Sequence, residues 1–397
     1  MRAEAMEVPA GKLWRVQSID TMKYSRDLAG EKGTDPSFDS TIDLQVRSIA
    51  GTGATHVAVG TPYDDQFIPF LTRWVSAARK YQLSVWFRGN FAGWENWFDY
   101  PDLSRADHLV KTRAFILSHK DLFQDGDIFT SCPECENGGP GDPRTTGDVA
   151  GYRRFIIDLY STCTQAFLDL KIQVTCNYFS SNGDVAKLIY DKPTVQGVGG
   201  VISIDHYVRT QKQLTSYISA LSQHTGAKIV LGEYGAPIPD IHGNLSQADQ
   251  AAWLEATLTA LAQTPQVEGL NYWTSFGGST ELWENDGTPR SAVAALSAFY
   301  NPPQYQILVK NEAGQALTTA RATYLDRIYQ ADNTGLISLP VLPGARQAVI
   351  SAPDYLSHGL QITAPGSTKF FALVKTHENW LFKLYKLTYR LFRGILP

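Results

Sequence analysis

The first 300 residues alternate between short β-rich runs and longer runs with helical periodicity, and this alternation limits the fold more than any other feature of the sequence. It indicates parallel strands joined by helical crossovers, and eight strands are the number that closes a (β/α)8 TIM barrel. The predicted strands are Arg15–Ile19, His56–Gly60, Ser84–Phe87, Ile128–Ser131, Lys171–Cys176, Val201–Ile204, Lys228–Leu231 and Gly269–Trp273.

An open, doubly wound α/β sheet is the alternative fold. A nucleotide-binding version of it would need a glycine-rich phosphate loop after the first strand. The sequence has Asp20-Thr21-Met22-Lys23 at that point, which argues against this version.

The pattern changes at Asn301-Pro302-Pro303, where the helical period ends. We therefore predict three parts: a barrel over residues 1–302, a small antiparallel β-sandwich over 303–375 and a helical tail over 376–397. The sandwich strands are predicted at Tyr305–Lys310, Arg321–Tyr324, Ile328–Gln330, Ile337–Leu339, Gln347–Ser351 and Phe370–Val374. Its turn and strand motifs resemble those of prealbumin-like, carboxypeptidase-regulatory modules.

The tail has an amphipathic helical pattern with basic residues on one face, namely Lys383, Lys386, Arg390 and Arg393. A basic amphipathic helix could make peripheral contact with an anionic membrane through residues 377–397. The alternative is ordinary packing against the rest of the protein or in a dimer.

Charge and hydropathy exclude some partners and leave the location of the protein open. The net charge of −4 gives no sign of a nucleic-acid partner, and no run of about 20 apolar residues predicts a spanning helix. The first 13 residues lack the apolar run of a signal peptide, so we expect a cytoplasmic protein or one trimmed of its leader. The oligomeric state does not follow from the sequence.

Four cysteines offer three interpretations. Cys132 and Cys135 have CxxC spacing, which is typical of redox motifs and of half a zinc site. Cys163 and Cys176 do not repeat that spacing, and no thioredoxin-like unit surrounds the pair. We therefore favour small buried residues near strand ends.

Polar and aromatic residues follow the predicted strands, at the end of a barrel where side chains converge. Two carboxylates stand out because they follow the fourth and seventh strands, whose ends face each other across the barrel mouth: Glu134 and Glu233. Glycoside hydrolysis needs such a pair, with one group to protonate the leaving oxygen and one on the other side of the anomeric carbon. A separation of about 5–5.5 Å would give a retaining reaction.

Three motifs in this region resemble those of the retaining (β/α)8-barrel glycoside hydrolase clan that includes cellulases and mannanases. They are Gly232-Glu233-Tyr234-Gly235, Asp205-His206-Tyr207 and Leu270-Asn271-Tyr272-Trp273. The resemblance implies that Glu233 is the nucleophile, that Tyr207 and Arg88 support it, and that Trp273 forms the floor of the site. No metal or cofactor is required. His206 is a further supporting candidate.

The fourth strand departs from the clan pattern, which has Asn-Glu where this chain has Pro133-Glu134. We prefer Glu134 as the acid/base because it follows the strand directly, and Glu136 is the alternative. The missing asparagine would contact the sugar 2-hydroxyl, so Asn137 or Asn177 could replace it. The remaining candidate sugar contacts are Tyr178, Trp94 and Asp20.

These features predict a retaining hydrolase that cleaves β-linked oligo- or polysaccharides through a covalent glycosyl-enzyme intermediate. The alternative is a barrel protein that binds carbohydrate without catalysis, which could associate with a membrane surface.

Overall fold

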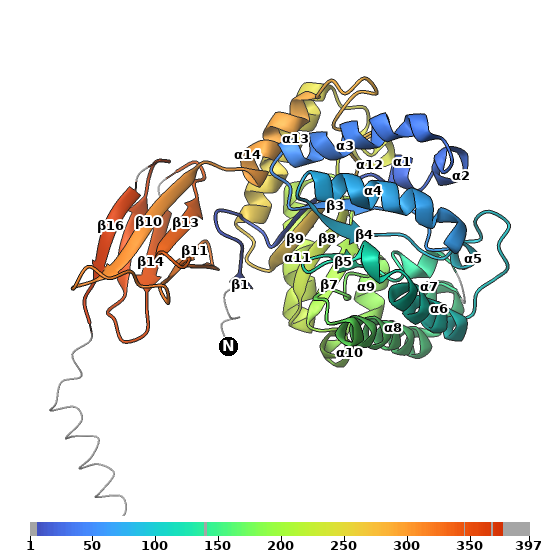
Figure 1. The fold of residues 1–397 in the computed structure, drawn as a ribbon, viewed down its shortest axis with the longest axis horizontal. Helices are drawn as coiled ribbons and strands as arrows, with labels where there is room; N and C mark the ends of the chain where they lie inside the picture. The colour runs from blue at the N-terminus through green and yellow to red at the C-terminus, as the bar shows by residue number, and fades with distance from the viewer. Residues whose placement is uncertain (1–5, 139–140, 345, 367, 376–397) are drawn as a thin grey trace, which may run out of the picture. The chain divides into compact units, whose positions relative to one another are not determined.

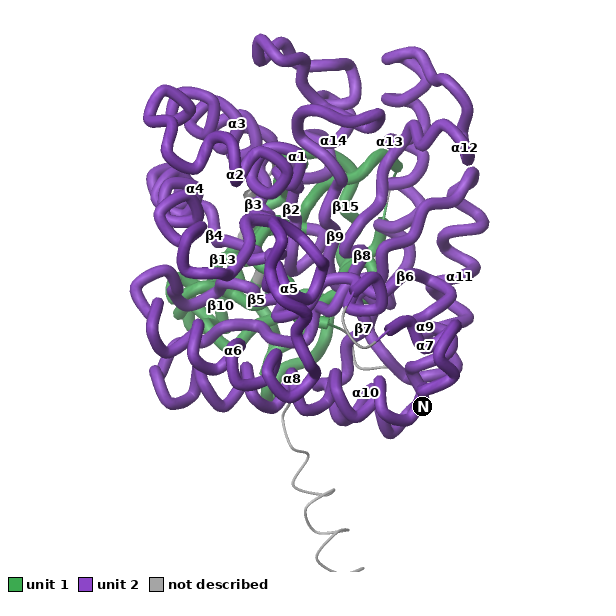
Figure 2. Tube along the Cα trace, turned by 90° about the vertical axis from the view of Figure 1, so that its right-hand side faces the viewer, with its two compact units in different colours: residues 1–12, 302–397 green, residues 13–301 purple. Residues whose placement is uncertain are grey.

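The computed structural model describes residues 6–138, 141–344, 346–366 and 368–375. The chain divides into two compact units, one of residues 13–301 and one of residues 1–12 with 302–397 (Figure 2). The predicted tail helix lies outside the described residues. Among the residues that are described, no helix is long and apolar enough to cross a membrane.

The larger unit contains an eight-stranded parallel sheet with the order β5-β4-β3-β2-β9-β8-β7-β6. A β-bridge between Ile128 and Thr175 connects β5 to the segment that leads into β6, so the sheet curls as a TIM barrel does (Figure 1). The strands are β2 Val16–Asp20, β3 His56–Val59, β4 Ser84–Phe87, β5 Ile128–Phe129, β6 Ser181–Asn182, β7 Val201–Asp205, β8 Lys228–Tyr234 and β9 Val267–Tyr272.

Helices surround this sheet on the outside (Figure 2). The four longest of the described helices begin at polar side chains that accept hydrogen bonds from free backbone N–H groups, and two of these caps, Thr210 and Ser246, form capping boxes. The α-helices are α1 Met22–Ser25, α2 Ala29–Lys32, α3 Asp39–Gly51, α4 Ile68–Lys80, α5 Ala92–Glu95, α6 Arg105–Ser118, α7 Pro143–Thr146, α8 Val149–Leu170, α9 Gly183–Ile189, α10 Lys192–Gly197, α11 Gln211–Thr225, α12 Pro239–His242, α13 Gln247–Ala262 and α14 Ser291–Tyr300. Short 3₁₀ helices are η1 Pro36–Phe38, η2 Asp65–Phe67, η3 Lys120–Leu122 and η4 Cys135–Asn137.

The fifth barrel strand differs from its predicted position. We predicted Lys171–Cys176, but there only Thr175 forms a bridge, and the regular pairing with β7 occurs at Ser181–Asn182. The strand is irregular between these two points, so its C-terminal end lies about six residues further along the chain than the hydrophobic pattern suggested. Residues just after 176 therefore lie away from the barrel mouth.

One cluster of buried side chains lies on the barrel strands and joins residues that are far apart in the sequence. Because successive residues of a strand point to opposite faces, every second residue can contribute to such a cluster. Its members are Val16, Ala58, Trp86, Ile128, Tyr178, Val201 and Val230.

The smaller unit contains two sheets that share a buried apolar core. The five-stranded sheet has the order β1-β12-β11-β14-β15, and the three-stranded sheet has the order β13-β10-β16. The strands of each sheet pair antiparallel, as predicted, except that β1 pairs with β12 and β10 with β16 in parallel. We had assigned residues 6–7 to the barrel, but they form β1 of this unit. The strands are β1 Met6–Glu7, β10 Gln304–Asn311, β11 Arg321–Tyr324, β12 Arg327–Gln330, β13 Leu336–Pro340, β14 Arg346–Ser351, β15 His358–Ile362 and β16 Thr368–Leu373.

All four cysteines are buried, as the favoured interpretation predicts, but they are joined in two disulfides, which it does not predict. Cys132 is bonded to Cys135, and Cys163 is bonded to Cys176. The first disulfide closes a loop of four residues after β5, and the second ties α8 to the irregular fifth strand.

Candidate active site

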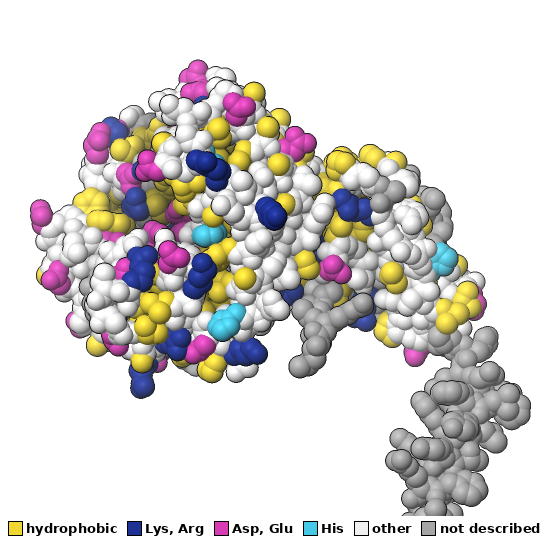
Figure 3. All heavy atoms as spheres, turned by 180° about the vertical axis from the view of Figure 1, so that it is seen from behind, with side chains coloured by type: hydrophobic (Ala, Val, Ile, Leu, Met, Phe, Trp, Pro, Cys, Tyr) yellow, Lys and Arg dark blue, Asp and Glu magenta, His cyan; other side chains and the backbone are white. Residues whose placement is uncertain are grey.

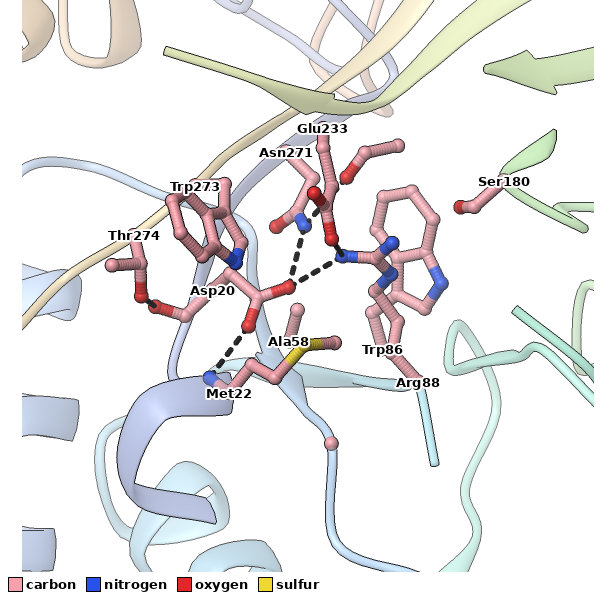
Figure 4. Close-up of polar contacts among 12 residues, drawn as sticks. Asp20, Met22, Ala58, Trp86, Arg88, Ser180, Glu233, Asn271, Trp273 and Thr274 are labelled. Carbon is pink, nitrogen blue, oxygen red and sulfur yellow. Dashed lines mark hydrogen bonds and ion pairs between the residues drawn. The ribbon is translucent and has the colours of Figure 1, made fainter. Parts of the chain in front are cut away.

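The C-terminal ends of five barrel strands bring one polar cluster together (Figure 4). Asp20 is the last residue of β2, Arg88 follows β4, Asp205 ends β7, Glu233 lies near the end of β8 and Asn271 lies in β9. Asp20, Arg88 and Glu233 are three of the predicted site residues.

Arg88 is the centre of this cluster and is almost fully buried. Its Nη1 donates to Asp20 Oδ2 at 2.6 Å and to Glu233 Oε1 at 3.1 Å, and its Nη2 donates to Asp205 Oδ2 at 3.0 Å. Asn271 Nδ2 donates to the same Asp20 oxygen at 3.0 Å. One planar guanidinium therefore fixes three carboxylates, as its fork of N–H donors allows.

Glu233 is held at both carboxylate oxygens, because the Tyr207 hydroxyl donates to Oε2 at 2.8 Å while Arg88 donates to Oε1. Burial raises the pKa of Glu233 above its ordinary value, and the charge of Arg88 and the Tyr207 hydrogen bond oppose this rise. Burial and the nearby charge of Glu233 raise the pKa of Asp205 further, well above its usual range. Glu233 is thus the carboxylate of this pair that is better placed to ionise.

The backbone at Glu233 is set by irregular pairing on both sides of β8. The register shifts between Ile204 and Asp205 on the β7 side, and between Leu231 and Tyr234 on the β9 side. Such bulges change the direction in which side chains point and are frequent beside active sites. Here the irregularity pairs Glu233 with Asp205, opposite Arg88.

Gly232 occupies a position with no room for a side chain. A Cβ there would lie 2.2 Å from Ser180 Oγ, 2.4 Å from Asp205 Oδ1 and 2.8 Å from Ser203 Oγ. The Gly232 carbonyl also accepts a hydrogen bond from Asn271 Nδ2 at 2.8 Å. Glycine is therefore required for the close approach of β8 to its neighbours.

We expect Gly232→Ala to lower the free energy of unfolding by about 1–3 kcal/mol, because the added methyl group overpacks a buried polar cluster. Urea denaturation measures this change. Gly51→Ala is the matched control, since a Cβ at Gly51 meets nothing within 4 Å, and it should be neutral or slightly stabilising in its helix. Equal stabilities of the two variants would contradict the packing argument.

The turn after β5 carries both candidate acid/base residues, which differ in their burial and hydrogen bonds. Glu136 is buried, and its carboxylate accepts hydrogen bonds from the Asn182 backbone N–H at 2.6 Å and from the Tyr152 hydroxyl at 3.2 Å. Glu134 is partly exposed, and burial, the charge of Glu233 and then that of Glu136 raise its pKa to about 8. Glu136 thus supports the turn, whereas Glu134 is the carboxyl group whose pKa the charge of Glu233 raises.

Sequence reasoning missed Glu95 at the C-terminal end of α5. Asn90 Nδ2 donates to its Oε1 at 2.7 Å, and burial raises its pKa to about 7. Its charge is close enough to Glu134 to contribute to the raised pKa of that group. Glu95 directly follows Trp94, a predicted sugar contact, and a carboxylate at that position was the available signal.

Trp273 lies half-buried directly after β9, and its peptide bond to Thr274 is cis. The Tyr207 ring meets its ring edge-on at 6.2 Å, and Lys23 Nζ lies 5.5 Å from the ring centre. Trp273 thus lies beside Tyr207, the hydrogen-bond partner of Glu233, and its role as the floor of the site stays a prediction. His206 contributes its backbone N–H to the Glu233 carbonyl at 3.0 Å, while its ring packs on Tyr217 at 4.1 Å.

Three predicted sugar contacts are contradicted by the structure. Trp94 is 1% exposed, stacks on Phe155 and donates to the Cys135 carbonyl at 3.2 Å, so it belongs to the core. The Tyr178 hydroxyl donates to Glu268 inside the barrel at 3.0 Å.

Asn177 is the third of these residues. It lines a cavity of about 400 Å³ together with Val201 and Lys228, the first residues of β7 and β8, so it lies at the opposite end of the barrel. Tyr178 and Asn177 lie away from the barrel mouth because the fifth strand ends further along the chain than predicted. Asn137 is exposed, and its backbone N–H donates to the Glu134 carbonyl at 2.8 Å.

The visible face in Figure 3 carries basic and acidic side chains interspersed, with hydrophobic side chains in scattered groups. No single sign of charge covers it. This mixed surface gives no electrostatic preference for a strongly charged macromolecule.

No known family model matches the chain, and no curated protein sequence matches it. Among solved structures, the fold is similar to an FMN-binding β-glucuronidase from Facaelibacterium prausnitzii L2-6, with a TM-score of 0.50, 12% identity, and coverage of 91% of this chain and 56% of that one. It is also similar to a GH5_18 protein from Streptomyces cattleya in complex with Manb1-4GlcNAc, with a TM-score of 0.54, 14% identity, and coverage of 73% and 79%. This chain thus spans little more than half the length of the first of these neighbours. These likenesses show a TIM-barrel fold shared with glycosidases.

Proposed function

We propose that this protein is a retaining glycoside hydrolase that acts on a β-linked sugar. One observation carries the proposal: a carboxylate at the end of β8 is held by Arg88 and Tyr207, and a second carboxyl group after β5 has a pKa raised to about 8 by burial and by the charge of the first. Two such carboxyl groups with different protonation states are what glycoside hydrolysis requires. The glycosidase neighbours support the proposal at the level of the fold.

In the proposed mechanism, Glu233 attacks the anomeric carbon while Glu134 donates its proton to the departing oxygen. The bond from the anomeric carbon to that oxygen breaks, and a bond to Glu233 forms. Glu134 then removes a proton from water, which attacks the same carbon and releases Glu233. Arg88 and Tyr207 stabilise Glu233 as an anion before attack and after release.

The two protonation states predict a bell-shaped dependence of kcat/KM on pH. The basic limb should lie near pH 8, because Glu134 must be protonated and loses its proton as the pH rises through its pKa of about 8. The acidic limb should lie above the usual glutamate range, because Glu233 must be ionised and its pKa is raised. Initial rates across pH 4–10 (roughly the range that covers both groups) measure this profile.

Glu136→Gln serves as the control for the basic limb. Removing its negative charge should move that limb to lower pH, because the charge of Glu136 helps to raise the pKa of Glu134. A basic limb that stays in place in Glu134→Gln would rule out Glu134 as its origin.

The experiment that tests the function is hydrolysis of a panel of aryl β-glycosides, with NMR of the first-formed sugar product. The panel begins with the β-glucuronide and the β-mannoside, because the structural neighbours are a β-glucuronidase and a protein bound to Manb1-4GlcNAc. The proposal expects cleavage with retention of the β configuration. Inversion would contradict the retaining mechanism.

A carbohydrate-binding protein without catalysis is the second candidate, and the replacement of the clan asparagine by Pro133 favours it. It predicts saturable binding of an oligosaccharide, measured by calorimetry, with no product after prolonged incubation. Turnover of any panel substrate by the wild type, abolished in Glu233→Gln, would exclude it.

The two disulfides favour an oxidising compartment over a reducing cytosol. Co-sedimentation of the full chain with vesicles of anionic lipid, with and without residues 377–397, tests the membrane contact; equal binding would remove the tail's role.

A further inference from the structure

Glu134 lies inside a loop that the Cys132–Cys135 disulfide closes. Cys132 and Cys135 flank Pro133 and Glu134, and their Cα atoms are 5.1 Å apart. Both cysteines are buried, with exposed fractions of 0% and 1%. The ring thus encloses the acid/base candidate and one proline, whose own φ is fixed by its side chain.

The backbone of Glu134 is in the left-handed region, with φ of 44° and ψ of 49°. This conformation is unfavourable for a residue with a Cβ, and it persists only where the surroundings hold it. Two backbone hydrogen bonds contribute: Glu134 N–H donates to the Phe179 carbonyl at 3.1 Å, and Asn137 N–H donates to the Glu134 carbonyl at 2.8 Å. The disulfide adds a covalent restraint on the same residue.

The disulfide is in turn attached to the segment that follows β4. Asn90 Nδ2 lies 3.6 Å from Cys132 Sγ, and Trp94 Nε1 donates to the Cys135 carbonyl at 3.2 Å. Asn90 lies two residues beyond Arg88, which binds Glu233. The segment after β4 therefore contacts both the loop that carries Glu134 and, through Arg88, the carboxylate of Glu233.

We infer that the Cys132–Cys135 disulfide is a positioning element for the acid/base step, which holds the Glu134 carboxyl group toward the leaving oxygen. The inference rests on the proposed function, since it assigns the loop a part in that reaction. The two cysteines act through Glu134 and do not touch the reacting atoms. Their loss should therefore impair proton donation and leave nucleophilic attack by Glu233 largely intact.

The short length of the loop distinguishes a positioning role from simple stabilisation of the fold. In the chain-entropy account, a disulfide stabilises more when it closes a longer loop. Cys132 and Cys135 are three residues apart, whereas Cys163 and Cys176 are 13 apart. If the disulfides served stability alone, removing Cys163–Cys176 should lower the free energy of unfolding more than removing Cys132–Cys135.

The test compares Cys132→Ser/Cys135→Ser with the matched control Cys163→Ser/Cys176→Ser. Each variant is assayed with a 2,4-dinitrophenyl glycoside, whose leaving group departs without protonation, and with the methyl glycoside of the same sugar, whose leaving group needs an acid. We expect the first variant to lose about 10- to 100-fold in kcat/KM on the methyl glycoside, the scale of a small misplacement of a catalytic group. Its kcat/KM on the dinitrophenyl glycoside should be unchanged, because kcat/KM reports the glycosylation step and that leaving group needs no acid.

The pH profile gives a second readout that loss of stability would not move. A less confined Glu134 is better solvated, so its pKa should fall, and the basic limb of the first variant should lie below pH 8. The control variant should keep both rates and the basic limb of the wild type. If the serine variant does not fold, as judged by circular dichroism, Cys132→Ala/Cys135→Ala replaces it, because it buries no unpaired hydroxyl.

Equal losses on both substrates, or a variant indistinguishable from the wild type, would overturn the inference. Failure of the proposed function looks different, since the wild type itself would then cleave neither substrate. The two failures are therefore separated within one experiment.

Discussion

Glu233→Gln is expected to lower kcat by about 10⁴- to 10⁶-fold, the scale seen when one member of a catalytic unit is removed. The amide is nearly the same size and keeps one oxygen, so the hydrogen bond from Arg88 or that from Tyr207 can survive. The amide has no anionic oxygen to attack the anomeric carbon. Initial rates on the best aryl glycoside, with thermal unfolding of the same sample, measure the effect.

Glu268→Gln is the matched control for this substitution. Glu268 is also a buried glutamate of the barrel strands, bonded to Arg15 and Tyr178, but it lies near the start of β9 at the opposite end of the barrel. It should keep the wild-type kcat. If Glu233→Gln retained more than a tenth or so of the wild-type rate, the assignment of the nucleophile would be wrong.

Glu134→Gln is expected to slow hydrolysis of a methyl glycoside by about 10²- to 10⁴-fold, the usual contribution of general acid–base catalysis. The effect on the glycosylation rate of a 2,4-dinitrophenyl glycoside should be far smaller, because that leaving group needs no proton. Pre-steady-state rates on both substrates measure the difference.

Glu136→Gln separates the two glutamates of the turn. Its carboxylate is already bound to Asn182 and Tyr152, so this change should lower stability and affect both substrates alike. A dependence on the leaving group in Glu136→Gln, and none in Glu134→Gln, would exchange their assigned roles.

The barrel and the residues at the centre of the site could be predicted from the sequence, because the ends of regular strands can be located from their sequence pattern. β2, β4 and β8 each have a charged residue at, near or directly after their C-terminal end, and those residues meet at the barrel mouth: Asp20, Arg88 and Glu233. The sequence motif contains Asp205 but gives no sign of its contact with Arg88, whose Nη2 lies 3.0 Å from Asp205 Oδ2, as close as its Nη1 lies to Glu233.

The fifth strand could not be located from periodicity because its pairing is broken. One bridge at Thr175 and two pairs at Ser181 and Asn182 leave an irregular segment between them, and no hydrophobic alternation marks such a segment. Every site residue predicted from that strand was consequently misplaced. The residues at the barrel mouth can be inferred from the predicted end of a strand when that strand is regular, and cannot when it is irregular.

The disulfides were missed for a different reason. Spacing alone cannot distinguish a four-residue disulfide loop from a redox pair or half a zinc site, and the partner of Cys163 depends on how α8 packs on the fifth strand. Trp94 was misassigned because a tryptophan near a barrel mouth can serve the core or a sugar equally well, and only its burial decides.

The central claim is that Glu233 forms a covalent bond to the sugar, and trapping that intermediate tests it most directly. The probe is the 2-deoxy-2-fluoro glycosyl fluoride of the sugar that the aryl-glycoside panel identifies: its fluorine at C2 slows both steps, while the fluoride leaving group lets the intermediate accumulate. We expect an intact mass increased by one fluorosugar and a labelled peptide in which the modified residue is Glu233. A label on another residue, or turnover with inversion and no label, would contradict it.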